Sequence, residues 1–245
     1  MRELDDKVAI VTGASRGIGR AIAERFAAAG AKTVIAARNL PELEELSAGI
    51  AKAGGSALAV KADVTSESDV KALFAAAVQA FGRVDILINN AGTSKALPTD
   101  ELSLDDWKRV LDTNVTGAFL CAREALRIMK PQKGGRIISI GSIAVLAPKQ
   151  HSATYTTTKH ALEGLTRTLA LDGRAHGIAA SIITLGTTRT SLNAHRPAET
   201  ARLEYQMDPA DVARVVLLMA SLPPEVNLFD ATMLPVSQPS FLGRG

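Results

Sequence analysis

Tyr155 and Lys159 lie four residues apart, and Ser142 precedes the tyrosine by thirteen residues at the end of an apolar run. The phenol of a tyrosine ordinarily has a pKa of about 10, so it is a poor proton donor or acceptor near neutral pH. A lysine one helical turn away lies on the same face, and its positive charge favours the phenolate form. A serine hydroxyl can hold a carbonyl oxygen beside the phenol. The trio therefore predicts protonation of an alkoxide as a hydride arrives, although the same tyrosine–lysine spacing also occurs on ordinary exposed helix faces.

A glycine-rich segment, residues 12–19, lies between the first apolar run and the first helical pattern. Glycines here let the backbone turn sharply and approach a pyrophosphate, whose charge is stabilised by the positive end of the following helix. Their spacing differs from the usual Gly-x-Gly-x-x-Gly pattern of dinucleotide sites, and an ordinary turn is the alternative interpretation. We expect a nucleotide cofactor to be bound here by Gly13, Ser15, Arg16, Gly17, Ile18 and Gly19.

The end of the second apolar run indicates which nicotinamide cofactor is preferred. A cofactor without a 2′-phosphate favours an acidic residue there, which binds the ribose hydroxyls. This chain has Ala37-Arg38-Asn39 instead. Arg38 and Arg16 would bind a 2′-phosphate through charge-assisted hydrogen bonds, although each is also compatible with a plain surface charge. With no acid at this position, the pair favours NADP(H).

The composition indicates one α/β domain spanning residues 1–245. The chain is 47% hydrophobic but only 4% aromatic, so Ala, Val, Ile and Leu must fill the core. That composition suits a sheet covered on both faces by helices. The 28 basic and 25 acidic residues leave a net charge of +3, with the basic residues scattered along the chain. This pattern does not indicate binding to nucleic acid or to a membrane.

Several other classes of protein are not indicated. The charged first residues do not form a signal peptide, and no apolar stretch reaches the roughly twenty residues of a membrane span, so a cytoplasmic protein is expected. The single cysteine, Cys121, excludes an internal disulfide, and its apolar neighbours predict a buried structural thiol. No set of cysteines and histidines has zinc-ligand spacing, so no metal site is expected.

Apolar runs of strand length alternate with amphipathic stretches of helix length. Strands are expected at 7–11, 33–37, 57–61, 85–88, 136–140, 178–184 and, more weakly, 231–234. Helices are expected near 17–29, 41–53, 67–81, 103–130, 153–175 and 209–220. The alternation predicts a Rossmann-type, doubly wound parallel sheet of about seven strands flanked by helices on both faces. The polar segment 186–208 lacks periodicity and is expected to be a substrate-binding lid.

Four motifs, in this order, resemble those of the short-chain dehydrogenase/reductase superfamily over nearly the whole chain. They are the loop 12–19, the pair Asp63-Val64, the segment Asn89-Asn90-Ala91-Gly92, and a match to the family's catalytic tetrad, Asn114, Ser142, Tyr155 and Lys159. The resemblance implies that Tyr155 is the general acid in reduction and the general base in oxidation. It also implies that Ser142 binds the substrate oxygen and that Lys159 binds the nicotinamide ribose. Asn114 would interrupt its helix and hold a water of the proton relay.

The resemblance also implies the other cofactor contacts. These are Asp63, Val64, Asn90, Ala91, Gly92, Gly186, Thr188 and Thr190, together with Tyr155 and Lys159. The chain departs from the family in two places. Leu185-Gly186 replaces the usual Pro-Gly and puts an apolar side chain near the expected nicotinamide site. The tail after Pro223 is similar to the branch that contains NADP-dependent 3-hydroxy acid (serine-type) dehydrogenases and clavulanate-type aldehyde reductases.

These features together predict an NADP(H)-dependent enzyme that interconverts a neutral ketone or aldehyde and an alcohol. Its substrate pocket is expected to be lined by Thr93, Ala144, Val145, Leu146, Gln150, His151, Leu185 and Leu192. His151 would bond a substrate oxygen or be an ordinary loop histidine. Arg189 and Arg196 would clamp a carboxylate or simply face solvent.

Two alternatives remain open at this stage. A 3-oxoacyl-[acyl-carrier-protein] reductase would use a basic docking patch, for which Arg123, Arg127 and Lys130 are candidates, although these residues could equally cap a helix end. A non-catalytic NADP(H)-binding sensor or scaffold would bind the cofactor without need for an intact tetrad. In either case the helices expected at 103–130 and 153–175 would form a dimer interface, as in similar proteins, with a tetramer as a further option.

Overall fold

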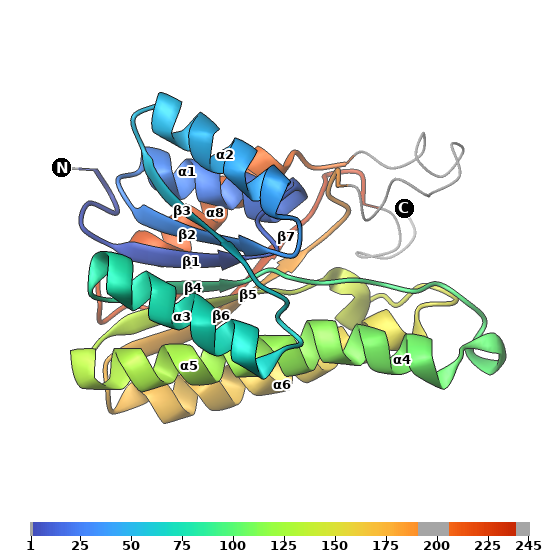
Figure 1. The fold of residues 1–245 in the computed structure, drawn as a ribbon. Coiled ribbons are helices and arrows are strands. Elements are labelled where there is room, and N and C mark those ends of the chain that lie inside the picture. The colour runs from blue at the N-terminus through green and yellow to red at the C-terminus, as the bar shows by residue number, and fades with distance from the viewer. Residues whose placement is uncertain (1, 191–205, 239–245) are drawn as a thin grey trace.

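The computed structural model describes residues 2–190 and 206–238 of the chain. They form a seven-stranded parallel sheet with the strand order β3-β2-β1-β4-β5-β6-β7 (Figure 1). The strands are β1 (Val8–Thr12), β2 (Lys32–Ala37), β3 (Ser56–Lys61), β4 (Ile86–Asn89), β5 (Gly135–Ile140), β6 (Ile178–Leu185) and β7 (Asp230–Met233). The predicted Rossmann-type fold is confirmed, and no strand end differs from its expected position by more than one residue.

Helices cover both faces of this sheet. They are α1 (Gly17–Ala28), α2 (Leu40–Lys52), α3 (Glu67–Phe81), α4 (Leu104–Leu111), α5 (Gly117–Gln132), α6 (Ala153–Arg174) and α8 (Pro209–Ser221). In Figure 1, α1, α2 and α8 lie above the sheet, and α3, α5 and α6 lie below it. The strand order reverses direction between β1 and β4, so the crevice at their carboxyl ends is where this class of sheet binds a nucleotide.

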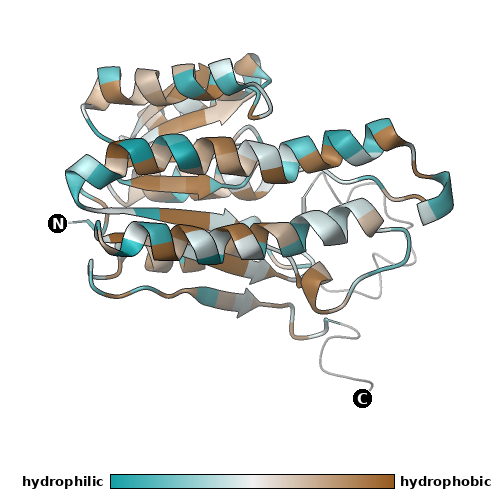
Figure 2. Ribbon diagram, turned by 90° about the horizontal axis from the view of Figure 1, so that it is seen from below, coloured by the Kyte–Doolittle hydropathy of each residue, from teal (hydrophilic) through white to brown (hydrophobic). Residues whose placement is uncertain are grey.

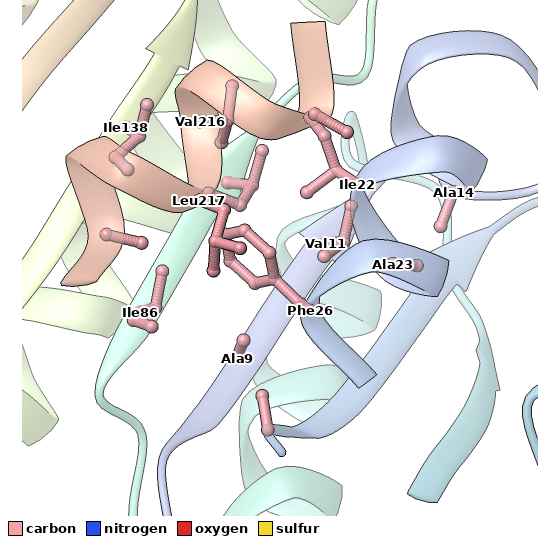
Figure 3. Packing of buried hydrophobic residues seen from close by; sticks show 14 of the residues in the cluster. Ala9, Val11, Ala14, Ile22, Ala23, Phe26, Ile86, Ile138, Val216 and Leu217 are labelled. Carbon is pink, nitrogen blue, oxygen red and sulfur yellow. The ribbon is translucent and has the colours of Figure 1, made fainter. Parts of the chain in front are cut away.

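A large buried cluster fills the space between the sheet and α1, α2 and α8. Phe26 of α1 belongs to the same cluster as Ala9 of β1, Ile86 of β4 and Leu217 of α8 (Figure 3). Ala9 projects only a methyl group, which leaves room for the aromatic ring. Full burial of a side chain such as Phe26 contributes about 1.5–3 kcal/mol to folding. Figure 2 shows the corresponding pattern, with apolar strands between helices that expose polar faces.

The helix expected near 103–130 is interrupted around Asn114, as the family resemblance implied. The stretch 103–130 contains α4, a π-helical turn (Asp112–Thr116) and α5. Within the turn, the N–H of Gly117 donates to the carbonyl oxygen of Asp112, five residues earlier. A single inserted residue leaves the helix axis nearly continuous, so the hydrophobic pattern does not reveal it. Asn114 is the buried residue at the centre of the turn.

Arg136, in β5, is a buried cation that holds the end of α8. It is only 8% exposed. Its Nη2 donates to the carbonyl oxygens of Leu222, Pro223 and Val226 at 2.6, 2.7 and 3.1 Å. Because Leu222 is the C-cap of α8, the guanidinium also neutralises the partial negative charge of that helix terminus.

We expect Arg136→Met to lower the free energy of unfolding by about 2–4 kcal/mol, because three carbonyl oxygens lose a charged donor. Guanidinium denaturation followed by circular dichroism measures the change. Arg136→Lys, which keeps a cationic donor, should lose less. Equal stability of the methionine variant and the unsubstituted protein would contradict the role given to Arg136.

Cys121 of α5 is fully buried, as predicted. Burial raises the pKa of its thiol from 9.0 to about 12, and Glu124 adds to the shift. At pH 8 the thiolate fraction of the folded protein should therefore be about 10³-fold below that of the unfolded chain. We expect no reaction with a thiol-specific disulfide reagent in buffer and one equivalent of reaction in denaturant. Rapid labelling of the native protein would show that the thiol is accessible.

The raised pKa of Cys121 also makes the stability of the protein depend on pH. The native thiol keeps its proton between pH 9 and 12, whereas the unfolded thiol loses it, so this group's contribution to stability falls as the pH rises through that range.

Among the described residues, no helix is long and apolar enough to cross a membrane.

Candidate active site

The segment after β4 locks the glycine-rich loop in place. Asn90 donates through Nδ2 to the carbonyl oxygens of Thr12 and Gly13, at 2.8 and 3.1 Å. The Thr12 hydroxyl donates to Ile88 O and accepts from the N–H groups of Asn90 and Ala91, each at 3.1 Å. These bonds join the carboxyl ends of β1 and β4 at the point where the strand order reverses.

The glycine-rich loop has the shape of a phosphate cradle. Gly13 and Gly17 have φ values of +64° and +59°, a region that disfavours residues with a side chain. A Cβ atom on Gly13 would lie 2.9 Å from Ala91 Cα, and one on Gly19 would overlap Asn90 Nδ2 and the Gly13 carbonyl. α1 begins at Gly17, so its unpaired N–H groups lie beside the loop. The residues present therefore fit the pyrophosphate of a dinucleotide.

A cavity of about 330 Å³ lies where the adenosine end of such a cofactor is expected. Its lining includes Arg38 after β2, Asp63 after β3, and Lys108 and Arg109 of α4. Arg38 is 80% exposed, and its Nη1 lies 3.9 Å from Asp63 Oδ2. Arg16 is also exposed. Both predicted arginines are therefore free of short carboxylate contacts within the described part of the chain.

Asp69 of α3 positions the loop that carries Asp63. Its Oδ2 accepts the Asp63 N–H at 3.0 Å, and its Oδ1 accepts the Ser66 hydroxyl at 2.9 Å. The Asp63 N–H, followed by Ser66, lowers the pKa of Asp69. Asp63 Oδ1 in turn accepts hydrogen bonds from the N–H and the hydroxyl of Thr65, and the other carboxylate oxygen, Oδ2, faces Arg38. Val64 is buried against Gly117, where α5 begins.

Tyr155 and Lys159 lie on one face of α6, as their spacing predicts. The Lys159 Nζ lies 5.5 Å from the centroid of the Tyr155 ring. Lys159 is only 7% exposed and donates to Ile140 O at 2.7 Å, which fixes its ammonium group at the carboxyl end of β5. Ser142 follows β5 and begins a short 3₁₀ turn (Ile143–Val145), its hydroxyl accepting the Ala144 N–H at 3.2 Å.

Asn114 links the π-helical turn to the other site elements. Its Oδ1 accepts the Thr93 N–H at 2.8 Å, and its Nδ2 donates to Thr93 O at 2.9 Å. The same Nδ2 donates to the Thr158 hydroxyl of α6 at 3.0 Å. The four residues of the predicted tetrad thus come from the 3₁₀ turn after β5, from α6 and from the π-helical turn, at the edge of the sheet where the glycine-rich loop follows β1.

The two ends of the predicted lid meet beside the cofactor crevice. Thr188 and Met207 form a parallel bridge, and the N–H groups of Arg189 and Met207 donate to Met207 O and Thr187 O, each at 3.0 Å. A Cβ on Gly17 would lie 3.4 Å from Thr190, so this strand-end segment packs against the glycine-rich loop. Arg189 forms an ion pair with Asp208. Of the lid 186–208, residues 191–205 lie outside the described part, including Leu192 and Arg196.

The residues predicted for the substrate pocket have different environments. Thr93 and Val145 are half-buried, Ala144 is buried, and Leu146, Gln150 and His151 are exposed. His151 has a φ of +60°, and its carbonyl oxygen accepts the Leu97 N–H, which ties the loop before α6 to the segment after β4. Leu185 is 5% exposed and packs in the core cluster with Met207. Its side chain therefore contributes to packing beneath the crevice, and its role in substrate fit stays a prediction.

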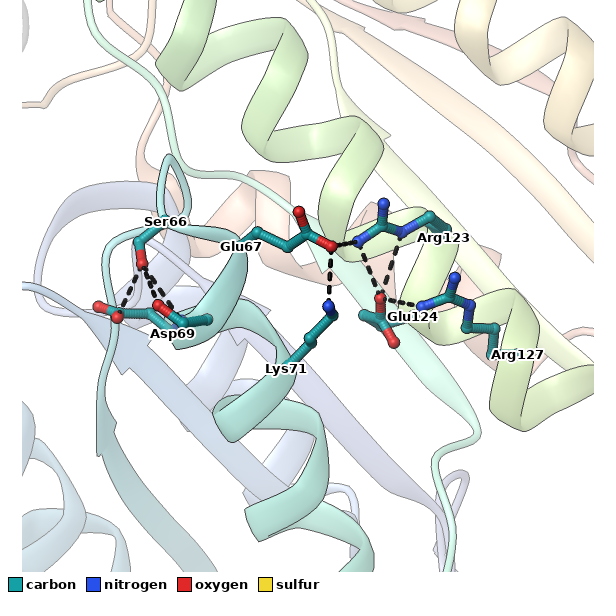
Figure 4. A network of polar contacts seen from close by, with 8 residues as sticks. Ser66, Glu67, Asp69, Lys71, Arg123, Glu124 and Arg127 are labelled. Atoms are coloured by element: carbon teal, nitrogen blue, oxygen red, sulfur yellow. Dashed lines mark hydrogen bonds and ion pairs between the residues drawn. The ribbon is translucent and has the colours of Figure 1, made fainter.

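The basic residues considered for carrier-protein docking are largely neutralised. Arg123 forms ion pairs with Glu67 of α3 and with Glu124, and Arg127 also pairs with Glu124 (Figure 4). Hydrogen bonds from Lys71 and then Arg123 hold the pKa of Glu67 below its usual value. The network joins α3 to α5, so it serves the packing of these two helices.

Three residues at the site were not predicted from the sequence. Thr12 ends an apolar strand and connects β4 to the glycine-rich loop. Asp69 holds Asp63, and Thr158 holds Asn114. The signal that could have found Thr158 is its place directly before Lys159 on the face of the helix that carries Tyr155. For Asp69 the sequence predicts only an acidic residue in the first turn of a helix.

This fold and site define an α/β oxidoreductase that binds a nicotinamide dinucleotide beside a tyrosine–lysine pair. A family model described as short chain dehydrogenase matches residues 7–201. The chain belongs to the short-chain dehydrogenase/reductase family.

Its similarity to individual members is moderate and covers most of the chain. It is 39% identical over 230 residues to a 3beta-hydroxysteroid dehydrogenase 1 of Eggerthella lenta, covering 89% of this chain and 88% of the relative. It is 35% identical to a 3-oxoacyl-[acyl-carrier-protein] reductase of Synechocystis, covering 91% and 92%. A solved metagenomic short-chain oxidoreductase in complex with NADP has a TM-score of 0.84 and 30% identity, covering 96% and 99%.

Proposed function

We propose that this protein is an NADP(H)-dependent oxidoreductase that interconverts a ketone or aldehyde and the corresponding alcohol, with Tyr155 as the general acid and base. The observation that carries the proposal is the convergence of Tyr155, buried Lys159 and Ser142 on the edge of the sheet that also holds the glycine cradle. Bound NADPH would supply the hydride that adds to the substrate carbon in reduction, and bound NADP⁺ would accept the hydride that leaves that carbon in oxidation.

Three side chains would bind the substrate oxygen and transfer the proton. In reduction, Ser142 would donate a hydrogen bond to the substrate oxygen while the Tyr155 hydroxyl delivers a proton to it. The Lys159 ammonium, held by Ile140 O, would stabilise the resulting phenolate and still have two N–H groups for the nicotinamide ribose and a water. In oxidation, the phenolate would take the proton from the alcohol.

The preference for NADP(H) over NAD(H) is supported by Arg38. Its side chain lies at the end of β2, where a carboxylate would be needed to bind the ribose hydroxyls of NAD(H). It is exposed, and in the described chain the only carboxylate within 4.0 Å of it is that of Asp63, 3.9 Å away. A 2′-phosphate would accept charge-assisted hydrogen bonds from this guanidinium and from Arg16.

The substrate class is proposed to be a neutral carbonyl compound. Arg189, the first candidate for a carboxylate clamp, is engaged by Asp208. Reduction of a 3-oxoacyl carrier protein is the second candidate, favoured by the similarity to the Synechocystis reductase. The pairing of Arg123 and Arg127 with glutamates weakens it, because a docking patch requires cations that are available to a partner.

We also propose a dimer formed through α5 and α6. Phe119 of α5 and Leu171 of α6 are 45% and 61% exposed, although both are large and apolar. Burial of such side chains against a second copy would provide a hydrophobic driving force for dimerisation.

The cytoplasmic location expected from the sequence stays a prediction.

The proposal is tested by the loss of NADPH absorbance at 340 nm with aryl ketones, aldehydes, hydroxysteroid ketones and acetoacetyl thioesters. We expect turnover of simple neutral carbonyls and a lower kcat/KM with NADH. Exclusive turnover of the thioesters would favour the carrier-protein alternative. Tight NADPH binding with no turnover of any carbonyl would favour a sensor or scaffold.

A further inference from the structure

Thr158 is a buried residue of the site that lies outside the predicted tetrad. It lies on α6 directly before Lys159 and is 1% exposed. Its hydroxyl accepts from Asn114 Nδ2 at 3.0 Å and donates to Tyr155 O at 2.9 Å. One hydroxyl thus contacts both the Asn114 side chain and the backbone of the residue that transfers the proton.

The direction of these hydrogen bonds is determined by the groups involved. A carboxamide nitrogen can only donate and a carbonyl oxygen can only accept. The Thr158 oxygen must therefore accept from Asn114, while its own hydrogen points to Tyr155 O. Rotating the Asn114 carboxamide by half a turn would set its oxygen against Thr93 O and its NH₂ against the Thr93 N–H, so the contacts with Thr93 exclude the other orientation.

The Asn114 carboxamide is buried, with 3% exposure, and both of its N–H groups are used. Removal of the Thr158 hydroxyl would leave one of them without an acceptor in the described surroundings, a loss that buried polar groups tolerate poorly. Asn114 would then move towards another partner and release Thr93. Thr93 lies in the segment that follows β4 along the crevice, so the disturbance would reach the substrate side of the site.

The geometry points to Thr158 as a positioning residue for the reaction, which sets Asn114 and the segment after β4 relative to the tyrosine helix. Its hydroxyl joins the π-helical turn to α6, and the Asn114 carboxamide extends this link to the segment at Thr93. The inference rests on the proposed carbonyl reduction and assigns to that reaction a residue beyond the tetrad.

The test compares Thr158→Val, which keeps the shape but loses the hydroxyl, with Thr158→Ser, which keeps the hydroxyl. Thr166→Val is the matched control, because Thr166 is equally buried on α6, and its hydroxyl donates to Leu162 O at 2.8 Å and lies 3.3 Å from Ser139 Oγ, with no contact to Asn114. We expect Thr158→Val to lower kcat about tenfold, which corresponds to the loss of one hydrogen bond in the transition state. KM for NADPH should change less than about twofold, and Thr158→Ser should restore most of the rate.

A second measurement does not depend on turnover. In the unsubstituted protein both side-chain N–H groups of Asn114 should exchange slowly with D₂O, followed by NMR of asparagine-labelled enzyme. In Thr158→Val, but not in Thr166→Val, one of them should exchange faster.

The outcomes separate this inference from the proposed function. If the unsubstituted enzyme reduces carbonyls and Thr158→Val keeps the kcat of Thr166→Val, the inference is overturned whatever the exchange shows. If the unsubstituted enzyme reduces no carbonyl, the proposed function fails. In that case only the hydrogen exchange of the Asn114 side chain tests the inference. Faster exchange in Thr158→Val would support the positioning of Asn114 by Thr158, and unchanged exchange would overturn it.

Discussion

Replacing Tyr155 with phenylalanine is expected to lower kcat for carbonyl reduction by about 10³-fold, within the 10²–10⁴ range of a positioned general acid. The substitution removes only the hydroxyl and keeps the ring that lies 5.5 Å from the Lys159 ammonium. The packing of α6 and the hydrogen bond from Lys159 to Ile140 should therefore persist. Steady-state turnover with NADPH and the best carbonyl substrate measures the loss.

Cofactor binding by the same variant provides the control. NADPH affinity, measured from the enhancement of its fluorescence, should change less than about threefold, because the loss is confined to the transition state. A tenfold weaker affinity together with the loss of rate would indicate that the ring had moved. Retention of most of the rate would show that another group protonates the substrate.

Replacing Arg38 with aspartate is expected to lower the ratio of kcat/KM for NADPH to that for NADH by about 10²-fold or more. The change removes a charge-assisted donor, worth about 1.5–3 kcal/mol. It also sets a carboxylate where the 2′-phosphate would lie and where ribose hydroxyls would be bound. Because Asp63 Oδ2 lies 3.9 Å from Arg38 Nη1, the new carboxylate would also repel Asp63 and weaken adenosine binding in general.

A charge change of the same size elsewhere tests whether the effect is local. Arg214→Asp on α8 alters the net charge equally at an exposed position away from the adenosine cavity. It should leave the cofactor ratio within about twofold, since exposed charges separated by more than about 10 Å are largely screened at moderate ionic strength. An unchanged ratio in Arg38→Asp would remove the argument for NADP(H).

The two expected results concern separate parts of the site and need not fail together. A chain that uses NAD(H) would fail the Arg38 prediction and still lose its rate with Tyr155→Phe. A chain that binds NADPH without turnover would have no rate to lose with Tyr155→Phe, and its cofactor preference would be measured from the ratio of the Kd values for NADPH and NADH. The preference for cofactor and the assignment of the general acid are therefore decided by independent measurements.

Several features followed from the sequence because they depend on neighbouring residues. The strands are runs of β-branched and small apolar residues, and the alternation with helices allowed only a parallel sheet with helices on both faces. The glycine-rich loop and the Tyr155–Lys159 pair are local motifs, because turn geometry and the pitch of a helix relate residues only a few positions apart. The burial of Cys121 followed in the same way from its apolar neighbours.

Other features depended on contacts between residues far apart in the chain. Arg123 is a candidate for a docking cation in the sequence. In the structure its Nη2 lies 2.8 Å from Oε1 of Glu67, 56 residues earlier, which neutralises its charge. Leu185 follows from the sequence only as an apolar residue near the expected nicotinamide site, and the structure adds that it packs in a core cluster with Met207. The contact between Thr158 and Asn114, 44 residues apart in the chain, forms only because α6 packs beside the π-helical turn. Sequence periodicity determined which elements form and what chemistry they carry, whereas packing between distant elements decided which side chains meet, because that choice depends on shape complementarity that no local pattern encodes.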